Sequence, residues 1–95
     1  MNPAKVERSR VKKLTDLPNI GKAMAADLHL LGINTPEDLI DKDPVELYQK
    51  LCVITEMRHD PCVLDVFMSI TDFVRGGVAR PWWEFTAQRK KMFKE

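Results

Sequence analysis

One short turn in this chain has the residue pattern best suited to binding an anion. Its sequence is Leu17-Pro18-Asn19-Ile20-Gly21, and a helical pattern follows it. A helix that starts here directs the backbone N–H groups of Gly21, Lys22 and Ala23 outward, and its dipole favours a negative charge beside them. Nucleic-acid phosphate is the commonest anion that fits, and the side chain of Lys22 adds a positive charge.

The residue types within this turn have separate expected roles. Pro18 fixes its own φ and ends the preceding helix at Leu17. Asn19 stands where such turns usually carry glycine, and asparagine is the next best residue at positive φ. Gly21 lets a ligand come close to the backbone because it has no Cβ. Leu17 and Ile20 are expected to point inward.

The spacing beyond the turn predicts a helix-hairpin-helix motif over about residues 6–33. Gly32-Ile33 follows Gly21 after eleven residues, and Ala25 and Leu28 share one helix face between them. The alternative is a plain turn between two core helices, with no ligand. A monovalent cation held by carbonyls of the hairpin is a further alternative.

The composition predicts one small domain over residues 1–95. The chain is 44% hydrophobic and 31% charged, which is ordinary for a globular protein. No apolar run approaches the roughly 20 residues that cross a bilayer, and the charged N-terminus resembles no secretory signal. We therefore expect a cytoplasmic protein with no membrane partner, in which Cys52 and Cys62 are reduced thiols.

Charge is spread unevenly, although the net charge is only +1. Residues 1–22 carry six bases against two acids, residues 23–87 are acidic, and residues 88–95 form a basic tail. Lys12 and Lys13 are the predicted charge partners of a phosphate at the turn. The alternative is a solvated helix face with a frayed tail.

Apolar periodicity predicts an all-α fold, a compact bundle of about five to six short helices. Thr35-Pro36, Asp43-Pro44 and Asp60-Pro61 each combine an N-cap residue with proline at the first helical position. The pattern over residues 61–74 is the most amphipathic and predicts the central core helix. The expected helices span residues 6–15, 22–31, 36–42, 44–54, 61–74 and 81–92.

Catalytic and metal-binding patterns are weak. Cys52, His59 and Cys62 lie close in sequence, but a zinc site usually needs a fourth ligand, and His29 is distant. No Ser/His/Asp order, Gly-rich phosphate loop or His-Glu-x-x-His motif is present, and no acid stands in an evidently apolar setting. We expect no cofactor, no metal and no enzymatic activity.

The C-terminal aromatic segment, residues 80–86, has two interpretations. Trp82 and Trp83 lie between Arg80 and Arg89, and aromatics interleaved with bases can stack on single-stranded bases. They can equally close the end of a small core, with an indole N–H bonded to a carbonyl. Core closure is favoured, with one tryptophan buried and the other exposed to a partner.

Two stretches of the chain resemble a known family. The first runs from the Leu17–Gly21 turn through Gly32-Ile33 to the Asp43-Pro44 helix start, and the second joins Asp60-Pro61-Cys62 to Arg80-Pro81-Trp82-Trp83. Together they resemble the bacterial pathogenicity-locus family, some of whose members are labelled mitomycin-resistance proteins. The first half is also similar to the C-terminal domain of the competence regulator TfoX. The resemblance implies a helical fold of the helix-hairpin-helix type, a bacterial origin and a possible link to DNA damage or transcription, but no reaction.

The leading hypothesis is a non-enzymatic helix-hairpin-helix module that contacts nucleic-acid backbone without reading sequence. Its predicted contacts come from Asn19, Gly21, Lys22 and Ala23, with Lys12 and Lys13 as charge partners. Established DNA binders commonly use two hairpins, and residues 58–61 lack the features of a second one. The competing hypothesis is a protein-interaction adaptor that uses Trp82 and Trp83 and binds no nucleic acid.

Overall fold

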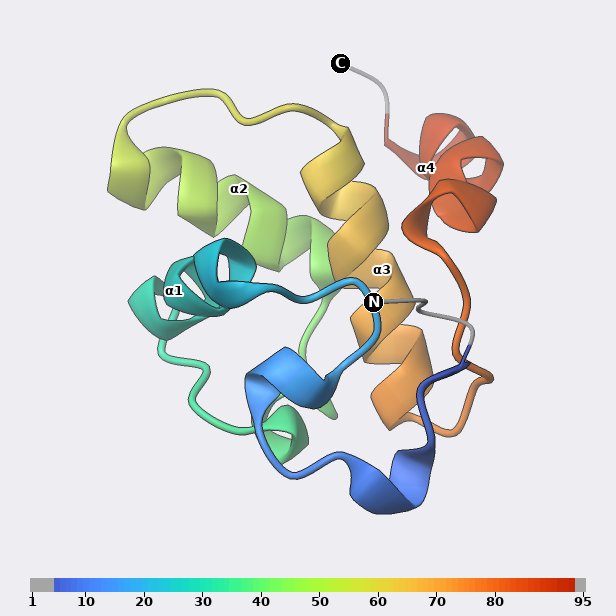
Figure 1. Cartoon of the computed structure of the whole chain (residues 1–95). Coiled ribbons are helices and arrows are strands. Elements are labelled where there is room, and N and C mark those ends of the chain that lie inside the picture. The colour runs from blue at the N-terminus through green and yellow to red at the C-terminus, as the bar shows by residue number, and fades with distance from the viewer. Residues whose placement is uncertain (1–4, 94–95) are drawn as a thin grey trace.

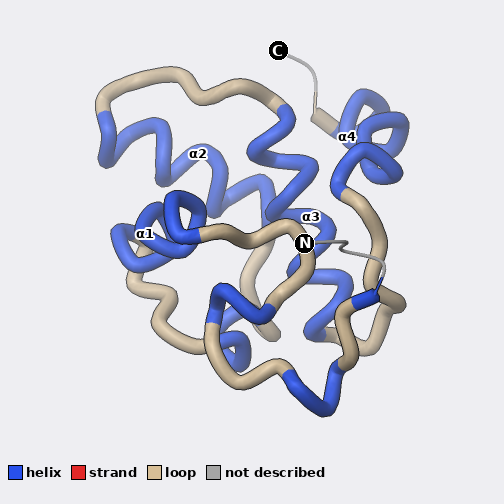
Figure 2. Tube along the Cα trace, viewed as in Figure 1, coloured by secondary structure: helices blue, strands red, loops and turns tan. Residues whose placement is uncertain are grey.

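The computed structural model describes residues 5–93, which form four α-helices linked by 3-10 turns and loops (Figure 1). Figure 2 shows helix and loop throughout this range, with no strand among residues 5–93. The all-α class is confirmed, with four α-helices rather than five to six. The α-helices are α1 (Lys22–Leu30), α2 (Pro44–Thr55), α3 (Cys62–Val74) and α4 (Thr86–Met92), and the 3-10 turns are η2 (Arg8–Arg10), η3 (Leu14–Asp16), η4 (Pro36–Leu39) and η5 (Trp82–Phe85).

Helix α3 is the centre of the fold, as its amphipathic pattern predicts. Residues 64–71 are all buried along it, and it contacts α2, α4, η4 and η5 (Figure 1). Phe67 and Ile70 are fully buried side chains of this helix. Burying a large apolar side chain stabilises the fold by about 1.5–3 kcal/mol, so α3 supplies much of the core.

Aspartate side chains cap the N-terminal ends of several of these elements. Asp43 Oδ1 accepts from the N–H of Val45 at 2.8 Å, which confirms the predicted start of α2. Asp60 Oδ1 accepts from the N–H of Cys62 at 2.8 Å, and α3 starts at Cys62, one residue after the predicted proline. At η4, Asp38 accepts from the N–H of Thr35, but this segment is a 3-10 turn ending at Leu39 rather than a helix to Lys42.

The prediction of a helix over residues 6–15 is wrong. The chain forms η2 and η3 instead, with extended backbone at Val11 and Lys13 between them. Val11 and Leu14, the expected inner positions, share a helical spacing, but Val6 lies five residues before Val11, so the apolar repeat covers only one turn. Asp16 Oδ2 accepts from the N–H groups of Lys12 and Lys13, at 3.0 and 3.1 Å, and these bonds favour a turn.

The last predicted helix, over residues 81–92, is divided. Residues 82–85 form η5, and α4 covers only residues 86–92. The end of this region packs more firmly than its sequence suggests, because the Phe93 ring meets Tyr48 edge-on at 5.5 Å between centroids. Residues 94 and 95 of the predicted basic tail lie outside the described residues. Among residues 5–93, no helix has the length and apolar character needed to cross a membrane.

Candidate nucleic-acid interface

Asn19 adopts the predicted positive φ, at 69°, and its side chain binds three groups. Its Nδ2 donates to Ser69 Oγ and to the carbonyl of Arg80, both at 3.0 Å. Its Oδ1 accepts from the backbone N–H of Trp82 at 3.2 Å. Asn19 therefore fixes the turn to α3 and to the aromatic segment, and its side chain is occupied within the protein.

The turn leads into an open helix start, which is the first turn of α1 with backbone N–H groups that have no acceptor within the described part of the chain. Leu17 and Ile20 are fully buried, as predicted, and anchor the turn in the core. Gly21 precedes α1 in extended conformation, and a Cβ built there would have no heavy atom within 4 Å. Across residues 5–93, no carbonyl or side chain accepts from the backbone N–H groups of residues 22–24.

This open start contrasts with the starts of η4, α2 and α3. Aspartate side chains accept backbone N–H groups at η4, α2 and α3, through Asp38, Asp43 and Asp60. At α1 the N-cap is Gly21, which has no side chain to offer. The first turn of α1 thus keeps its donors, and its dipole, available to an external anion.

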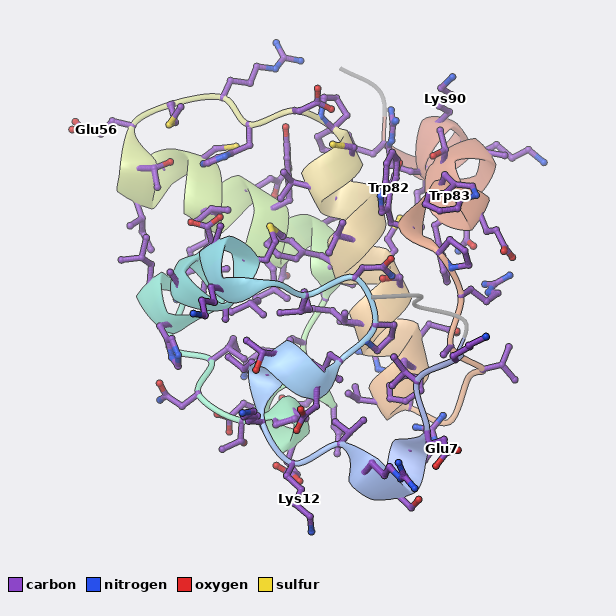
Figure 3. All side chains as sticks on the ribbon, in the orientation of Figure 1. Glu7, Lys12, Glu56, Trp82, Trp83 and Lys90 are labelled. Atoms are coloured by element: carbon purple, nitrogen blue, oxygen red, sulfur yellow. The ribbon has the colours of Figure 1, made fainter. Side chains whose placement is uncertain are left out.

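The basic residues predicted to contact phosphate lie in two separate parts of the structure. Lys22 and Ala23 are exposed in the first turn of α1. Lys12 points out of the lower edge of the molecule in Figure 3, whereas α1 starts nearer its middle. Asp16 lies between Lys12, Lys13 and the turn, and backbone N–H bonds from both lysines lower the pKa of this carboxyl. The structure therefore brings Lys22 to the site, but not Lys12.

Two other N-terminal bases are used within the fold. The Arg8 guanidinium donates to the carbonyls of Phe73 and Gly77 and lies 4.2 Å from the centroid of the Phe73 ring. Arg10 pairs with Glu7 at 3.1 Å. The positive charge counted over residues 1–22 is consequently smaller in effect than its sum suggests.

The two tryptophans differ in exposure, as the sequence predicts. Trp82 is partly buried against the core, whereas 58% of Trp83 is exposed (Figure 3). Their rings meet edge-to-face, with centroids 5.6 Å apart. The Arg80 guanidinium lies 4.2 Å from the centroid of the buried Phe85 ring. Through Asn19, this aromatic segment adjoins the turn that begins α1.

One buried ion pair was not predicted from the sequence. Asp65 in α3 is fully buried, and its Oδ1 accepts from Arg89 Nε at 2.9 Å. Its Oδ2 accepts from Thr86 Oγ1 at 2.7 Å. Asp65 is thus a buried acid that the sequence did not predict, with Arg89 and Thr86 as polar partners, and Arg89 is part of a docked helix rather than a frayed tail. The one available signal was the charge of Asp65 within the apolar run of residues 63–67.

The two cysteines are free thiols, and His59 has another partner. His59 Nε2 lies 2.8 Å from Thr55 Oγ1, and both cysteines are free and partly buried. Burial raises the pKa of the Cys62 thiol, and the nearby Asp60 raises it further. Within residues 5–93, no three or more His, Cys, Asp or Glu side chains are grouped so as to hold a metal ion.

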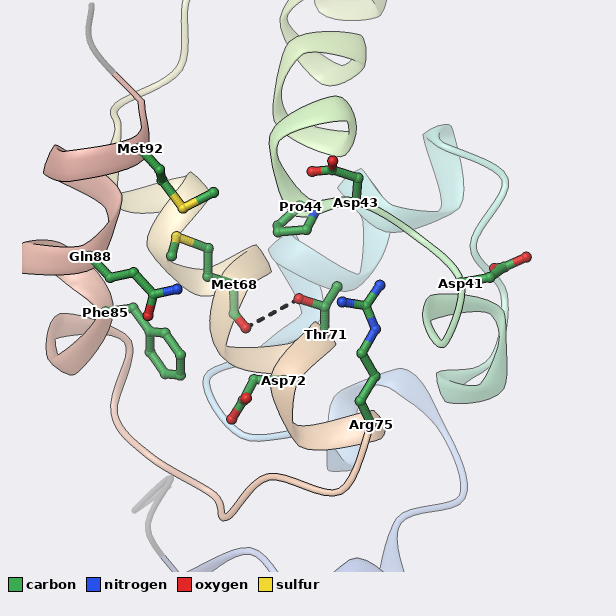
Figure 4. A pocket seen from close by; sticks show the side chains of 10 residues that line it. All are labelled: Asp41, Asp43, Pro44, Met68, Thr71, Asp72, Arg75, Phe85, Gln88 and Met92. Atoms are coloured by element: carbon green, nitrogen blue, oxygen red, sulfur yellow. Dashed lines mark hydrogen bonds between the residues drawn. The ribbon is translucent and has the colours of Figure 1, made fainter.

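A hollow of about 400 Å³ lies elsewhere, between α2, α3 and α4 (Figure 4). Met68 and Met92 line one side of it, and Thr71 and Arg75 line the other. The Arg75 guanidinium donates to the carbonyls of residues 40 and 42, so the fold uses this charge. In Figure 4, α1 lies behind α2 and α3, which places the hollow on the side away from the open helix start.

The fold and site define a small all-α protein with an uncapped helix start beside an aromatic segment. The chain belongs to the family described as Pathogenicity locus (Cdd1), which matches residues 7–91. It is 43% identical over 79 residues to "Mitomycin resistance protein McrB" of Streptomyces lavendulae, covering 83% of this chain and 75% of that protein. No solved structure matches the chain significantly.

Proposed function

We propose that this protein is a non-enzymatic, cytoplasmic bacterial module that binds nucleic-acid phosphate at the start of α1, without reading base sequence. The observation that carries the proposal is the open first turn of α1. The backbone N–H groups of residues 22–24 have no acceptor among residues 5–93, and Gly21 leaves the approach to them free. A phosphate oxygen satisfies such donors and interacts favourably with the helix dipole.

Gly21 supports the proposal because the fold does not require a glycine there. Its φ is −98°, which any residue adopts, and a Cβ would meet nothing within 4 Å. Glycine at this position lets the backbone of a nucleic-acid ligand come close to the N–H groups at the start of α1. The exposed Lys22 next to it adds the positive charge that a phosphate prefers.

The exit from α1 agrees with a helix-hairpin-helix arrangement. Gly32 has φ +81°, and the N–H of Ile33 bonds to the carbonyl of Leu28 at 2.9 Å, so the helix closes with a left-handed glycine. Ile33 is buried, like Leu17 at the entry. In this proposal the 3-10 turn η3 occupies the position of the first helix of a standard hairpin. Like that helix, it leads directly into the turn that precedes the second helix.

The expected binding is weak and sensitive to salt. One helix start contacts few phosphates, and each neutralised phosphate adds about one unit to the slope of log affinity against log salt. The mitomycin-resistance name of a relative supports a role near damaged DNA, and we propose the same setting for this chain.

Fluorescence anisotropy with labelled short duplex DNA, at about 50 and about 200 mM salt, tests the proposal. We expect Gly21→Val to weaken binding about tenfold, since a branched side chain blocks the donors. Ala26→Val is the matched control, because it adds a branched side chain on an exposed position of the same helix. Equal losses in the two variants, or no binding at the lower salt, would contradict the proposal.

The second candidate function is a protein-interaction adaptor, which the exposure of Trp83 favours. A large exposed aromatic is a common anchor of a protein interface. This function predicts no affinity for nucleic acid even at low salt, together with a partner that is lost in Trp83→Ala. Pull-downs that recover the same proteins with the wild type and with Trp83→Ala would argue against it.

A further inference from the structure

We propose that Trp83 and the open start of α1 contact one ligand, a nucleic acid with an unstacked base, rather than a continuous duplex. This inference rests on the proposed function and specifies its ligand as a single strand or an open end. It combines a phosphate contact at α1 with a base contact at the aromatic segment.

The first argument is the direct connection between the two parts. The Asn19 side chain donates to the carbonyl of Arg80 and accepts from the N–H of Trp82. Asn19 is also two residues before Gly21, the N-cap of α1. Residues more than 60 positions apart in the chain are therefore fixed beside one another, so the turn before α1 and the backbone of the aromatic segment are held together before any ligand binds.

The second argument is the support that Trp83 receives. Its ring meets the ring of Trp82 at 84°, with centroids 5.6 Å apart, and Trp82 itself packs against the core. With 58% of its surface exposed, Trp83 keeps ring area open to solvent. An aromatic ring supported on one side and open on the other is a stacking surface that loses little freedom on binding.

The third argument is the charge around this ring. Lys90 and Lys91 are exposed on α4, and Figure 3 shows Lys90 and Trp83 on the same part of the molecule. Arg80 lies at the start of the segment, with its guanidinium over Phe85. Glu84 is the acid that opposes them. Bases beside an exposed aromatic ring are the combination that binds single strands.

Stacking on Trp83 requires a ligand that has an exposed base face. In the interior of a duplex both faces of each base are covered by its neighbours, so a protruding indole finds a free face only at the terminal pairs, where the base is still paired. A single strand, an overhang or a frayed end offers one. Stacking on an aromatic side chain contributes about 1–3 kcal/mol per base, so affinity for such ligands exceeds that for the blunt duplex.

The test compares anisotropy for a labelled single strand, the blunt duplex of the same sequence, and that duplex with an overhang, as DNA and as RNA. We expect the wild type to favour the single strand and the overhang, with quenching of tryptophan fluorescence. Trp83→Ala should weaken these two ligands about tenfold and leave the blunt duplex nearly unchanged. Trp83→Phe should retain most of the affinity.

Met57→Ala is the matched control, because Met57 is also 58% exposed but lies beyond the end of α2. Equal affinity for the single strand and the duplex, or equal losses in Trp83→Ala and Met57→Ala, overturns this inference alone, provided that Gly21→Val still weakens binding. If no oligonucleotide binds at low salt, the proposed function fails as well, and Trp83 becomes a candidate contact for a protein partner.

Discussion

The side chain of Asn19 accepts a hydrogen bond from the backbone N–H of Trp82 at 3.2 Å, across 63 residues of sequence. The same side chain donates to Ser69 and to the carbonyl of Arg80. A single amide thus joins the turn before α1, the central helix and the aromatic segment. This connection places two sequence features that look independent next to one another in the fold.

Replacing Asn19 with glycine should separate its backbone role from its side-chain role. Gly adopts the φ of 69° without strain, but it leaves Trp82 N–H and two further groups without their partner. We expect Asn19→Gly to lower the free energy of unfolding by about 1–3 kcal/mol in urea denaturation. Asn19→Ala should cost about 1 kcal/mol more, because it adds strain at positive φ. Equal stability of the glycine variant and the wild type would show that these bonds contribute nothing.

The buried pair of Asp65 and Arg89 should be costly to break from one side only. Arg89→Met leaves the fully buried carboxylate of Asp65 without its cation, so we expect a loss of about 3–5 kcal/mol and release of α4. The double variant Asp65→Leu with Arg89→Met removes both charges and should recover most of that loss. Urea denaturation of the two variants measures the difference. A double variant no more stable than Arg89→Met would mean that the pair does not act as a unit.

Arg8 should contribute to stability although it belongs to a charged, exposed segment. Its guanidinium caps the carbonyl of Phe73 at the end of α3 and bonds to Gly77. We expect Arg8→Gln to cost about 1–2 kcal/mol, seen as a fall in Tm of several degrees. Lys12→Gln, a change of equal charge in an exposed turn, should leave Tm unchanged. A similar fall in both variants would point to net charge as the cause.

Acid should destabilise the protein through its capping aspartates. Backbone N–H bonds from Asn34 and Thr35 lower the pKa of Asp38 below its ordinary value of 3.8, and comparable bonds lower the pKa of Asp60. The ionised carboxyl therefore stabilises the folded state. Its contribution is full above pH 3.8 and is lost as the pH falls through the lower folded-state value.

Urea midpoints measured from pH 7 down to about pH 2 should show this decline. In Asp38→Asn the decline should be shallower, because one of the titrating groups has been removed. An unchanged profile in this variant would show that other carboxyls cause the acid sensitivity.

Local signals explain why much of the fold could be predicted. Asp43-Pro44 gives the start of α2 because the cap and the fixed φ act within three residues. The apolar repeat of residues 61–74 identifies α3 as the core helix, since only a central helix buries so wide a face. The same reasoning anticipated the positive φ of Asn19 and the burial of Leu17 and Ile20.

The failures lie where local signals are weak. Residues 6–15 contain helix-forming residues, but only Val11 and Leu14 among their apolar positions share a helical spacing, and the Asp16 carboxylate favours a turn at residues 12 and 13. Short helices gain little without packing, so small side-chain preferences decide the outcome. Residues 36–42 and 81–92 shorten for the same reason.

The all-α class, the principal helices and the form of the turn before α1 follow from local sequence, because caps, proline and periodicity act over a few residues. Which charged and polar side chains the fold uses depends instead on long-range packing. Asp65 meets Arg89, Arg8 meets Phe73, and Asn19 meets Trp82 only after α3 has packed against both ends of the chain. Residue types alone cannot distinguish these side chains from solvated ones, since each partner lies at least 24 residues away.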